Sequence, residues 1–482
     1  MRPTLQHGQG WPHLLQSADC NRSATSASPA AMNAFTSCNP ASGEVVFTRP
    51  ALDADCLPPL LAGLRQAQHR WSRLDTVART ERMLLLADHL AAQRHALAEL
   101  VSLEVGKLLR ECLAEIDKSV QLIRYYAELA PRLLAPQDIP TGASKSGVAF
   151  EPLGLVLAIM PWNYPVWQVL RFAVPALMAG NACLVKPAPS VPQSTALLLD
   201  IVQGAGLDVL DVAWINHDAV DDAIRGVDAV AFTGSTSTGR QIAAMAGRHL
   251  KKSVLELGGS NPFIVLADAD VETAATEAAH SRFRDAGQSC NAAKRMIVVP
   301  EVADAFIEAF MAQVQALVPG HPADAVTTLA PLTRADLREA LHAQVLDAVH
   351  NGARLLAGGV MPHGVGFYYP ATVLDEVTPA CRVYHEEVFG PVASILRARD
   401  EADAIRLAND TPFGLGATIF SADTEHAWQL GRDIEAGAVF INRYTSSDLR
   451  LPFGGVKASG YGRELSEFGL YEFVNVKTYW QK

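Results

Sequence analysis

The sequence lacks any apolar run of the roughly 18 to 20 residues that a membrane-spanning helix needs. Its best candidate, "LGLVLAIM" (153–160), has the length of a strand and is followed at once by Pro161. An excess of positive charge is also missing, because 51 acidic residues outnumber 40 Lys and Arg and leave a net charge of −11. This balance argues against nucleic acid or an anionic membrane surface as a partner.

Cysteine is sparse and shows no pattern. The seven cysteines are scattered along the chain, and none of them forms a CxxC pair. Such a set fits neither a disulfide framework nor a zinc site, so we expect no bound metal and a reducing, cytoplasmic compartment. A single nucleophilic cysteine remains compatible with this composition.

The first 31 residues lack clear periodicity. They are rich in Ser, Ala, Gln and Pro, and they contain no apolar segment of the kind that a secretory signal carries. We expect a disordered extension over residues 1–31. Translation is expected to start at Met32, where "MNAFTSCNPASGEVV" has the composition of an ordered domain.

The remainder of the chain has the pattern of an α/β protein of two or three domains, because 482 residues exceed one ordinary core. Apolar residues recur every three or four positions from about 52 to 135, which predicts helices. Short apolar runs then alternate with helical segments over 165–265 and 262–455, and "VAWINH" (212–217) is one of the expected strands. This alternation predicts parallel sheets with the ligand at the carboxyl ends of their strands.

Several polar residues fall where those strands should end. Ser235 opens a helix after Gly234, and backbone N–H groups at such a point bind phosphate. Lys186 could reach a ribose or phosphate, Asn163 lies between two prolines and could support an oxyanion, and Glu256 could be a general base. Taken singly, each has an ordinary structural interpretation: a hydroxyl cap, a solvated lysine, a turn asparagine or an ion-paired glutamate.

Cys290 stands among small and polar residues in "DAGQSCNAAKR". This setting suits a nucleophile if the residue begins a helix or turn that offers N–H groups. On the local pattern alone, an inert core cysteine is the commoner interpretation.

An ordered set of motifs changes the balance between these alternatives. The chain contains, in this order, "PWNYP", "LVKPAP", "FTGST", "LELGGSNPFIVLADAD", "GQSC", "HEEVFGPV", "ANDTPFGLGATIF" and "PFGGVKASGYGREL". From about residue 36 to its end it resembles the aldehyde dehydrogenase superfamily. The resemblance implies an α/β fold with a Rossmann-like NAD(P)-binding domain (32–133 and 153–262), a catalytic domain (263–458) and an oligomerisation arm (134–152 and 459–482) of a homodimer or homotetramer. An exposed terminal strand in "YEFVNVKTYW" would also pair within the chain or with a second subunit.

The resemblance also implies roles for individual residues. The expected catalytic residues are the nucleophile Cys290, the oxyanion donor Asn163, the base Glu256 and a second glutamate, Glu464. The expected residues of the NAD or NADP site are Trp162, Lys186, Gly234, Ser235, Glu387 and Phe389. The implied reaction proceeds through a thiohemiacetal and a thioester to a carboxylate.

Two arginines suggest the substrate. Arg171 and Arg284 flank the expected entrance, and with the loop that carries Ser447 they resemble bacterial succinate-semialdehyde dehydrogenases. Arginine suits a carboxylate at the far end of the aldehyde. Ser446 and Arg450 are further candidates for that pocket. Alternatives are surface ion pairing of the arginines, another small aldehyde such as glutarate semialdehyde, or a catalytically silent binding protein.

The sequence departs from its relatives at two positions. Pro189 stands where many NAD-specific relatives carry a glutamate that repels a 2′-phosphate, so the choice between NAD and NADP stays open. Ala292 stands where some succinate-semialdehyde enzymes carry a second cysteine, so we expect no redox switch.

Overall fold

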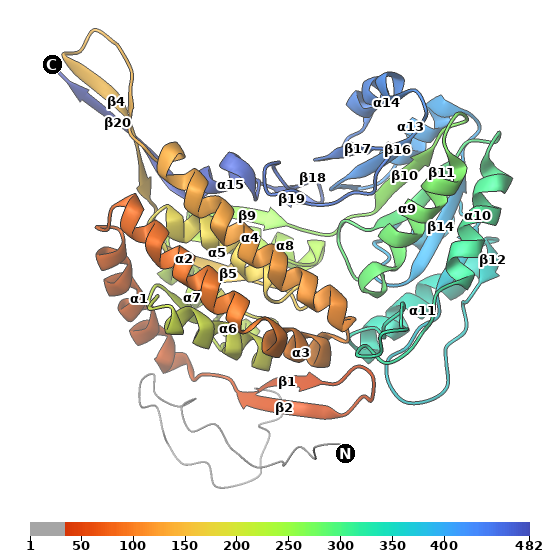
Figure 1. Ribbon diagram of the computed structural model, residues 1–482, viewed down its shortest axis with the longest axis horizontal. Coiled ribbons are helices and arrows are strands. Elements are labelled where there is room, and N and C mark those ends of the chain that lie inside the picture. Colours follow the sequence, from red (N-terminus) through yellow and green to blue (C-terminus); the bar gives the residue numbers. More distant parts are fainter. Residues whose placement is uncertain (1–33) are drawn as a thin grey trace.

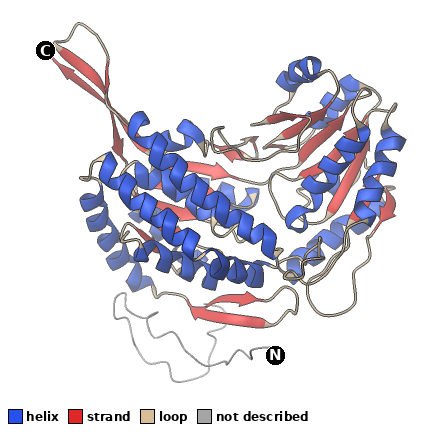
Figure 2. Ribbon diagram, viewed as in Figure 1, coloured by secondary structure: helices blue, strands red, loops and turns tan. Residues whose placement is uncertain are grey.

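The computed structural model describes residues 34–482, so the predicted extension and the start at Met32 lie outside the described residues. Two α/β units lie side by side, and a thin β-arm that ends at the C-terminus projects from one of them (Figure 1). Helices cover the sheets of both units (Figure 2). Within the described part of the chain, no helix is both long and apolar enough to cross a bilayer.

The chain begins with a hairpin and a helical layer. β1 (Ala34–Cys38) pairs antiparallel with β2 (Val45–Pro50). The helices that follow are α1 (Leu57–Trp71), α2 (Thr76–Ala92), α3 (Arg94–Val105) and α4 (Leu109–Leu133). They confirm the helical pattern predicted for 52–135, and α4 packs against α2, α3 and a later helix, α5 (Trp167–Met178).

The first sheet has the strand order β19-β9-β8-β5-β6-β7. Its strands are β5 (Leu155–Ile159), β6 (Ala182–Lys186), β7 (Leu210–Val212), β8 (Ala229–Thr233), β9 (Lys252–Glu256) and β19 (Gly460–Tyr461). The connecting helices are α5 (Trp167–Met178), α6 (Pro192–Gly204), α7 (Val220–Gly226) and α8 (Thr236–Arg248). All neighbouring pairs from β9 to β7 are parallel, and only β19 is antiparallel to its neighbour.

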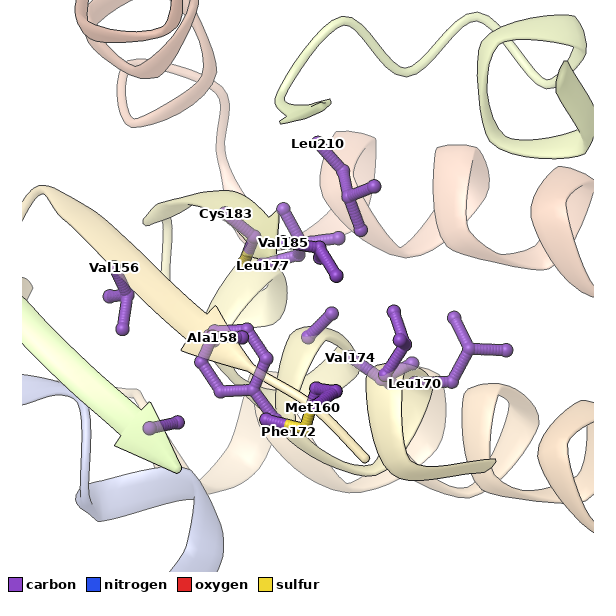
Figure 3. Packing of buried hydrophobic residues seen from close by; sticks show 14 of the residues in the cluster. Val156, Ala158, Met160, Leu170, Phe172, Val174, Leu177, Cys183, Val185 and Leu210 are labelled. Carbon is purple, nitrogen blue, oxygen red and sulfur yellow. The ribbon is translucent and has the colours of Figure 1, made fainter. Parts of the chain in front are cut away.

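Apolar side chains fill the space between this sheet and α5 (Figure 3). Val156 and Ala158 of β5 and Val185 of β6 are fully buried, as are Leu170 and Val174 of α5. Burying a side chain of this kind stabilises the fold by about 1.5–3 kcal/mol. The sheet edge that carries the site is therefore anchored on the face that α5 covers.

The predicted strand in "VAWINH" was wrong in extent. β7 ends at Val212, because its pairing with β6 stops at Val185. The residues beyond are apolar for another reason: Trp214 packs edge-on against Phe35 at 5.2 Å between ring centroids, and its carbonyl accepts a hydrogen bond from Leu52.

The second sheet has the order β12-β13-β14-β11-β10-β16-β17. Its strands are β10 (Asn261–Val265), β11 (Ala293–Val298), β12 (Arg354–Ala357), β13 (Thr372–Asp375), β14 (Val392–Arg397), β16 (Ala417–Phe420) and β17 (Val439–Ile441). Its helices are α9 (Val271–Phe283), α10 (Ala303–Gln315), α11 (Ala335–His350), α12 (Arg382–His385), α13 (Glu401–Asn409) and α14 (Thr424–Leu430). Only β12 runs antiparallel to its neighbour, so the predicted second α/β unit is confirmed.

The arm is an antiparallel sheet of β3 (Gln137–Asp138), β4 (Lys145–Pro152) and β20 (Val474–Gln481). β20 pairs with β4 along its whole length, so the terminal strand finds its partner inside the chain. Beside these sheets lie the helix α15 (Ser466–Tyr471), which contacts α5, and the short strand pair β15 (Phe413–Gly414) and β18 (Val456–Lys457).

Candidate active site

The first sheet brings three of the predicted cofactor residues and the predicted base Glu256 to one edge. Lys186 is the last residue of β6, Glu256 is the last residue of β9, and Gly234 and Ser235 follow β8. Because these strands are parallel, their carboxyl ends share an edge. This is the place at which open α/β sheets bind their ligands.

The turn after β8 has the form expected of a phosphate site. Ser235 is the N-cap of α8, and its Oγ accepts a hydrogen bond from the Thr238 N–H at 3.3 Å. The Gly234 N–H donates to the Glu256 carbonyl at 3.0 Å, which ties this turn to the end of β9. The N–H groups of the first helical turn and the helix dipole favour an anion here.

Lys186 lies buried at the same edge. Its Nζ has a long contact of 3.4 Å with the Pro187 carbonyl, and burial lowers the pKa of its ammonium to about 8. A buried amine with so little protein bonding fits a ligand oxygen. Its burial rules out the alternative of a solvated strand-end lysine.

Glu387 and Phe389 come to this region from the second unit. The Glu387 carboxylate accepts hydrogen bonds from the Gly259 N–H at 3.0 Å and from Lys294 Nζ at 2.7 Å. Phe389 contacts Trp162 edge-on, with 5.8 Å between the ring centroids. The carboxylate passes so close to Gly258 that a Cβ there would lie 2.4 Å from it, which explains the glycine.

Cys290 lies in a turn between a short 3-10 segment, η4 (Arg284–Gly287), and β11. The backbone before it is strained, since Asp285 and Ala286 have φ of 53° and 51°. Gly287 has φ of 73°, and a Cβ there would meet the Gly390 carbonyl at 2.3 Å. Cys290 is half-buried on the wall of a cavity of about 630 Å³ and is not a sealed core residue.

Opposing influences act on the pKa of the Cys290 thiol. Burial raises the pKa of Cys290 to about 11, while the cations Arg171 and Lys294 act to lower it. Lys294 is fully buried, and its Nζ donates to the Cys290 carbonyl at 3.1 Å and to Glu387. The Lys294 ammonium therefore connects the backbone of Cys290 to Glu387, one of the predicted cofactor residues.

Asn163 reaches the same turn from the end of β5. Its Nδ2 donates to the Gln288 carbonyl at 3.0 Å, two residues before Cys290. Its Oδ1 is buried without a hydrogen-bond partner among the described residues. The amide group is thus fixed beside the nucleophile's loop.

The two predicted glutamates share a buried site with Arg171. Glu464 forms an ion pair with Arg171 at 2.5 Å. Burial, reinforced by Glu464, raises the pKa of Glu256 to about 8. Both Glu256 carboxylate oxygens are buried without hydrogen-bond partners in the described structure, and so is Nη2 of Arg171. A carboxyl group with this pKa and free oxygens can accept a proton from water near neutral pH.

The cavity also contains the residues predicted to bind substrate. Arg171, Arg284, Ser446 and Ser447 line it together with Cys290. Arg284 bonds Asp285 at 3.2 Å and lies over the Tyr444 ring.

Arg450, proposed from sequence as a pocket residue, is placed elsewhere. Its side chain is largely exposed and forms an ion pair with Asp448 at 2.7 Å, and it does not line the cavity. The two residues are near neighbours in sequence, so the arginine satisfies its charge locally at the surface.

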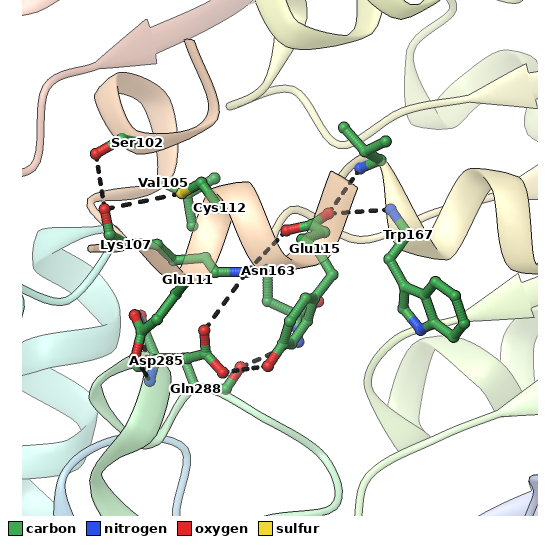
Figure 4. A network of polar contacts seen from close by, with 12 residues as sticks. Ser102, Val105, Lys107, Glu111, Cys112, Glu115, Asn163, Trp167, Asp285 and Gln288 are labelled. Carbon is green, nitrogen blue, oxygen red and sulfur yellow. Dashed lines mark hydrogen bonds and ion pairs between the residues drawn. The ribbon is translucent and has the colours of Figure 1, made fainter. Parts of the chain in front are cut away.

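A buried charge network supports the wall of the cavity (Figure 4). Lys107 lies between Glu115 at 2.8 Å and Asp285 at 3.5 Å. Glu115 accepts hydrogen bonds from the Val166 and Trp167 N–H groups, and Tyr164 donates its hydroxyl to Asp285. The network links α4, the start of α5 and the nucleophile's loop.

Sequence reasoning missed this network and Lys118. A helical spacing gave a usable signal, because Glu111, Glu115 and Lys118 follow each other at four and three residues and therefore share one face of α4. All three line the cavity. Lys294 gave another signal, a charged residue four positions after Cys290 at the start of an apolar strand.

The comparisons with known proteins agree with this geometry. Residues 27–479 match the model of the aldehyde dehydrogenase family. The chain is 44% identical over 449 residues to the succinate semialdehyde dehydrogenase [NAD(P)+] Sad of Escherichia coli K12, covering 92% of this chain and 97% of that protein. It is 43% identical to the succinate-semialdehyde dehydrogenase [NADP(+)] of Deinococcus radiodurans, covering 92% of this chain and 94% of that protein.

The crystal structure of succinic semialdehyde dehydrogenase from Streptococcus pyogenes in complex with NADP+ superposes with a TM-score of 0.90 at 34% identity, covering 92% of this chain and 99% of that one. These matches cover nearly the full length of each relative. The chain belongs to the aldehyde dehydrogenase family.

Proposed function

We propose that this protein oxidises succinate semialdehyde to succinate with NAD or NADP. The observation that carries the proposal is a single cavity that joins Cys290 to Arg171, Arg284 and Lys118. A thiol that can attack an aldehyde thus shares one space with cations that suit a distal carboxylate. The relatives in Escherichia coli and Deinococcus radiodurans are named for this activity.

The first half of the reaction belongs to Cys290. Its thiolate attacks the aldehyde carbon and forms a thiohemiacetal, and the oxyanion is stabilised by the Asn163 amide and the Cys290 N–H. A bound nicotinamide dinucleotide supplies the acceptor for the hydride that leaves this carbon. Loss of hydride leaves a thioester on Cys290.

The second half belongs to Glu256. It takes a proton from water, the resulting hydroxide attacks the thioester carbonyl, and the Cys290 thiolate leaves as succinate forms. Glu256 has two free carboxylate oxygens and a pKa of about 8, which suit this task. Glu464, paired with Arg171, sets the charge beside Glu256 and completes the buried group.

The residues present fit a dinucleotide. The first turn of α8 after Gly234 and Ser235 would hold the pyrophosphate, and Lys186 and Glu387 would hold ribose hydroxyls. Trp162 and Phe389 would bound the nicotinamide. Pro189 offers no carboxylate to repel a 2′-phosphate, and the names of the relatives include NADP(+).

The arrangement of the units supports further parts of the proposal. The NAD(P)-binding domain would comprise 32–133 and 153–262, the catalytic domain 263–458, and the arm 134–152 and 459–482. Val476 and Trp480 of β20 are each 58% exposed, which favours burial of the arm against another subunit of a cytoplasmic homodimer or homotetramer.

An aldehyde panel tests the proposed function. Succinate semialdehyde, glutarate semialdehyde, butanal and betaine aldehyde are each assayed with NAD and with NADP by absorbance of the reduced cofactor. We expect kcat/KM for succinate semialdehyde to exceed that for butanal by at least about 100-fold, because a buried ionic hydrogen bond is worth about 1.5–3 kcal/mol and the three cations Lys118, Arg171 and Arg284 line the cavity. Equal rates with butanal would refute the substrate assignment.

A variant pair tests the chemistry in the same assay. Cys290→Ala should abolish turnover, whereas Cys183→Ala should keep it, because the buried Cys183 belongs to the core of the first sheet. Survival of turnover in Cys290→Ala would contradict the assigned nucleophile. If turnover is higher with glutarate semialdehyde than with succinate semialdehyde, glutarate semialdehyde is the preferred substrate.

A further inference from the structure

We propose that Lys118 is a substrate-binding residue that, with Ser447, recognises the distal carboxylate of the aldehyde. This inference rests on the proposed function and extends it to a residue of the helical layer. Lys118 lies in the middle of α4 and lines the same cavity as Cys290. It therefore reaches the substrate cavity from a different element than the two arginines.

The charges of the two arginines are already partly neutralised. Arg171 is paired with Glu464 at 2.5 Å, and Arg284 is bonded to Asp285 at 3.2 Å. Lys118, by contrast, has no ion pair with a carboxylate within 4.0 Å among residues 34–482. Of the three cations it is the one whose full charge faces the cavity without a direct counter-ion.

The hydrogen bonds of Lys118 leave room for a ligand. Its Nζ donates to the Ser447 carbonyl at 2.8 Å and to Ser447 Oγ at 2.5 Å. An ammonium has three N–H donors, and the third has no oxygen partner in the described part of the chain. The Lys118 Nζ also lies 4.5 Å from the Trp167 ring centroid, which holds the side chain along the cavity wall.

The bond to Ser447 gives that serine a fixed direction. Ser447 Oγ accepts from Lys118, so its own hydroxyl hydrogen is free to donate to a second acceptor. Lys118 N–H and Ser447 O–H together form a two-donor site, and a carboxylate has two oxygens to accept them. A neutral aldehyde of the same length has nothing to offer to either donor.

The charge of Lys118 depends on pH in the working range. Burial, together with Arg171 and Arg284, lowers the pKa of the Lys118 ammonium to about 8, and Asp448 acts the other way. Above pH 8 a growing share of Lys118 is neutral, so the preference for an anionic substrate should fall. Burial also raises the pKa of Glu111, on the same helix, to about 7. Glu111 is present in the wild type and in every variant, so its titration is common to all of them.

The experiment measures kcat/KM for succinate semialdehyde and for butanal and uses their ratio, in which changes of the shared chemistry cancel. The variants are Lys118→Met, Lys118→Arg and, as a matched control, Arg124→Met, which removes a cation from the exposed face of the same helix. We expect Lys118→Met to lower the ratio by about 10-fold to 100-fold through a higher KM for the acid. Arg124→Met should leave the ratio unchanged.

The pH dependence separates the possible outcomes. Between pH 7 and 9.5 the ratio should fall in the wild type more than in Lys118→Arg, because a guanidinium keeps its charge. A wild type without preference for the acid would refute the proposed function. If the wild type prefers the acid and Lys118→Met keeps that preference, the role proposed for Lys118 is refuted and the proposed function is not. If Lys118→Met does not fold, equal pH profiles of wild type and Lys118→Arg would still overturn the proposal.

Discussion

At the scale of single residues, the two reactive groups of the site, Cys290 and Glu256, are mainly in their neutral forms at neutral pH. Burial raises the pKa of Cys290 to about 11 and that of Glu256 to about 8, so at neutral pH both are mainly protonated. A thiol must lose its proton to attack, and a carboxyl group must lose its proton to act as a base. Both groups therefore become active as the pH rises.

We therefore expect kcat to rise with pH through about 8 if thioester hydrolysis limits turnover. Because the Glu256 pKa is raised, its active carboxylate form is present above that pKa and is lost as the pH falls below it. Steady-state rates and pre-steady-state bursts between pH 6 and 9.5 measure this. Glu256→Gln should slow turnover and remove the rise, while a flat wild-type profile would contradict the assigned base.

Pro189 is the residue that should govern the choice of cofactor. A carboxylate at this position, three residues after Lys186, would repel a 2′-phosphate. We expect Pro189→Glu to lower kcat/KM for NADP by at least about 10-fold, since like charges at close range cost more than about 1.4 kcal/mol. Pro189→Gln is the matched neutral control. Equal losses with NAD and NADP in Pro189→Glu would show that the change acts through the backbone instead.

At the scale of elements, the nucleophile's loop depends on a helix far away in the sequence. Lys107, just before α4, neutralises both Glu115 on that helix and Asp285 in the loop. Asp285 has a left-handed backbone that such contacts must stabilise. The helical layer therefore positions the loop of Cys290 through Asp285.

Removing Lys107 should damage both stability and the loop. Lys107→Met leaves two buried carboxylates without their cation, which costs about 3–5 kcal/mol and should lower Tm by several degrees. The rate of Cys290 alkylation by iodoacetamide should change as well, because the loop loses its anchor. Arg94→Met, which breaks a more exposed ion pair between α3 and α4, is the control and should cost less than about 1 kcal/mol. Equal effects of the two variants would contradict this view.

The same elements show what sequence alone could and could not predict. α4 and the strands that end at Lys186 and Glu256 follow from local periodicity, because one face or both faces of each element are buried. The pairing of Lys107 with Asp285 does not follow, because it joins residues that only the tertiary fold brings together. Likewise, the apolar residues beyond Val212 indicated burial. They did not indicate that β7 ends at Val212, where its pairing with β6 stops.

At the scale of the whole molecule, the arm leaves large apolar side chains in water. β4 and β20 project away from both units (Figure 1). The side chains of Tyr479 and Trp480 on β20 are about half exposed. A monomer gains little from such an extension. Burial against another subunit would recover the hydrophobic free energy of these side chains.

We expect Trp480→Ser to weaken self-association, with a smaller mass by light scattering as the protein is diluted. Trp428→Ser is the control, because Trp428 is an equally large and exposed side chain on α14 of the other unit. Its mass should match the wild type at every concentration. An unchanged mass of Trp480→Ser down to nanomolar concentration would contradict a role of the arm in assembly.

The single ammonium of Lys294, shared by Glu387 and the Cys290 carbonyl, has a thermodynamic consequence. Anything that draws Glu387 toward a ligand also changes the field at the thiol, so the two halves of the site are energetically linked. Linkage is reciprocal: the factor by which the dinucleotide changes affinity for the aldehyde is the factor by which the aldehyde changes affinity for the dinucleotide. The equilibrium free energy of the ternary complex is therefore the same whichever of the two ligands binds first.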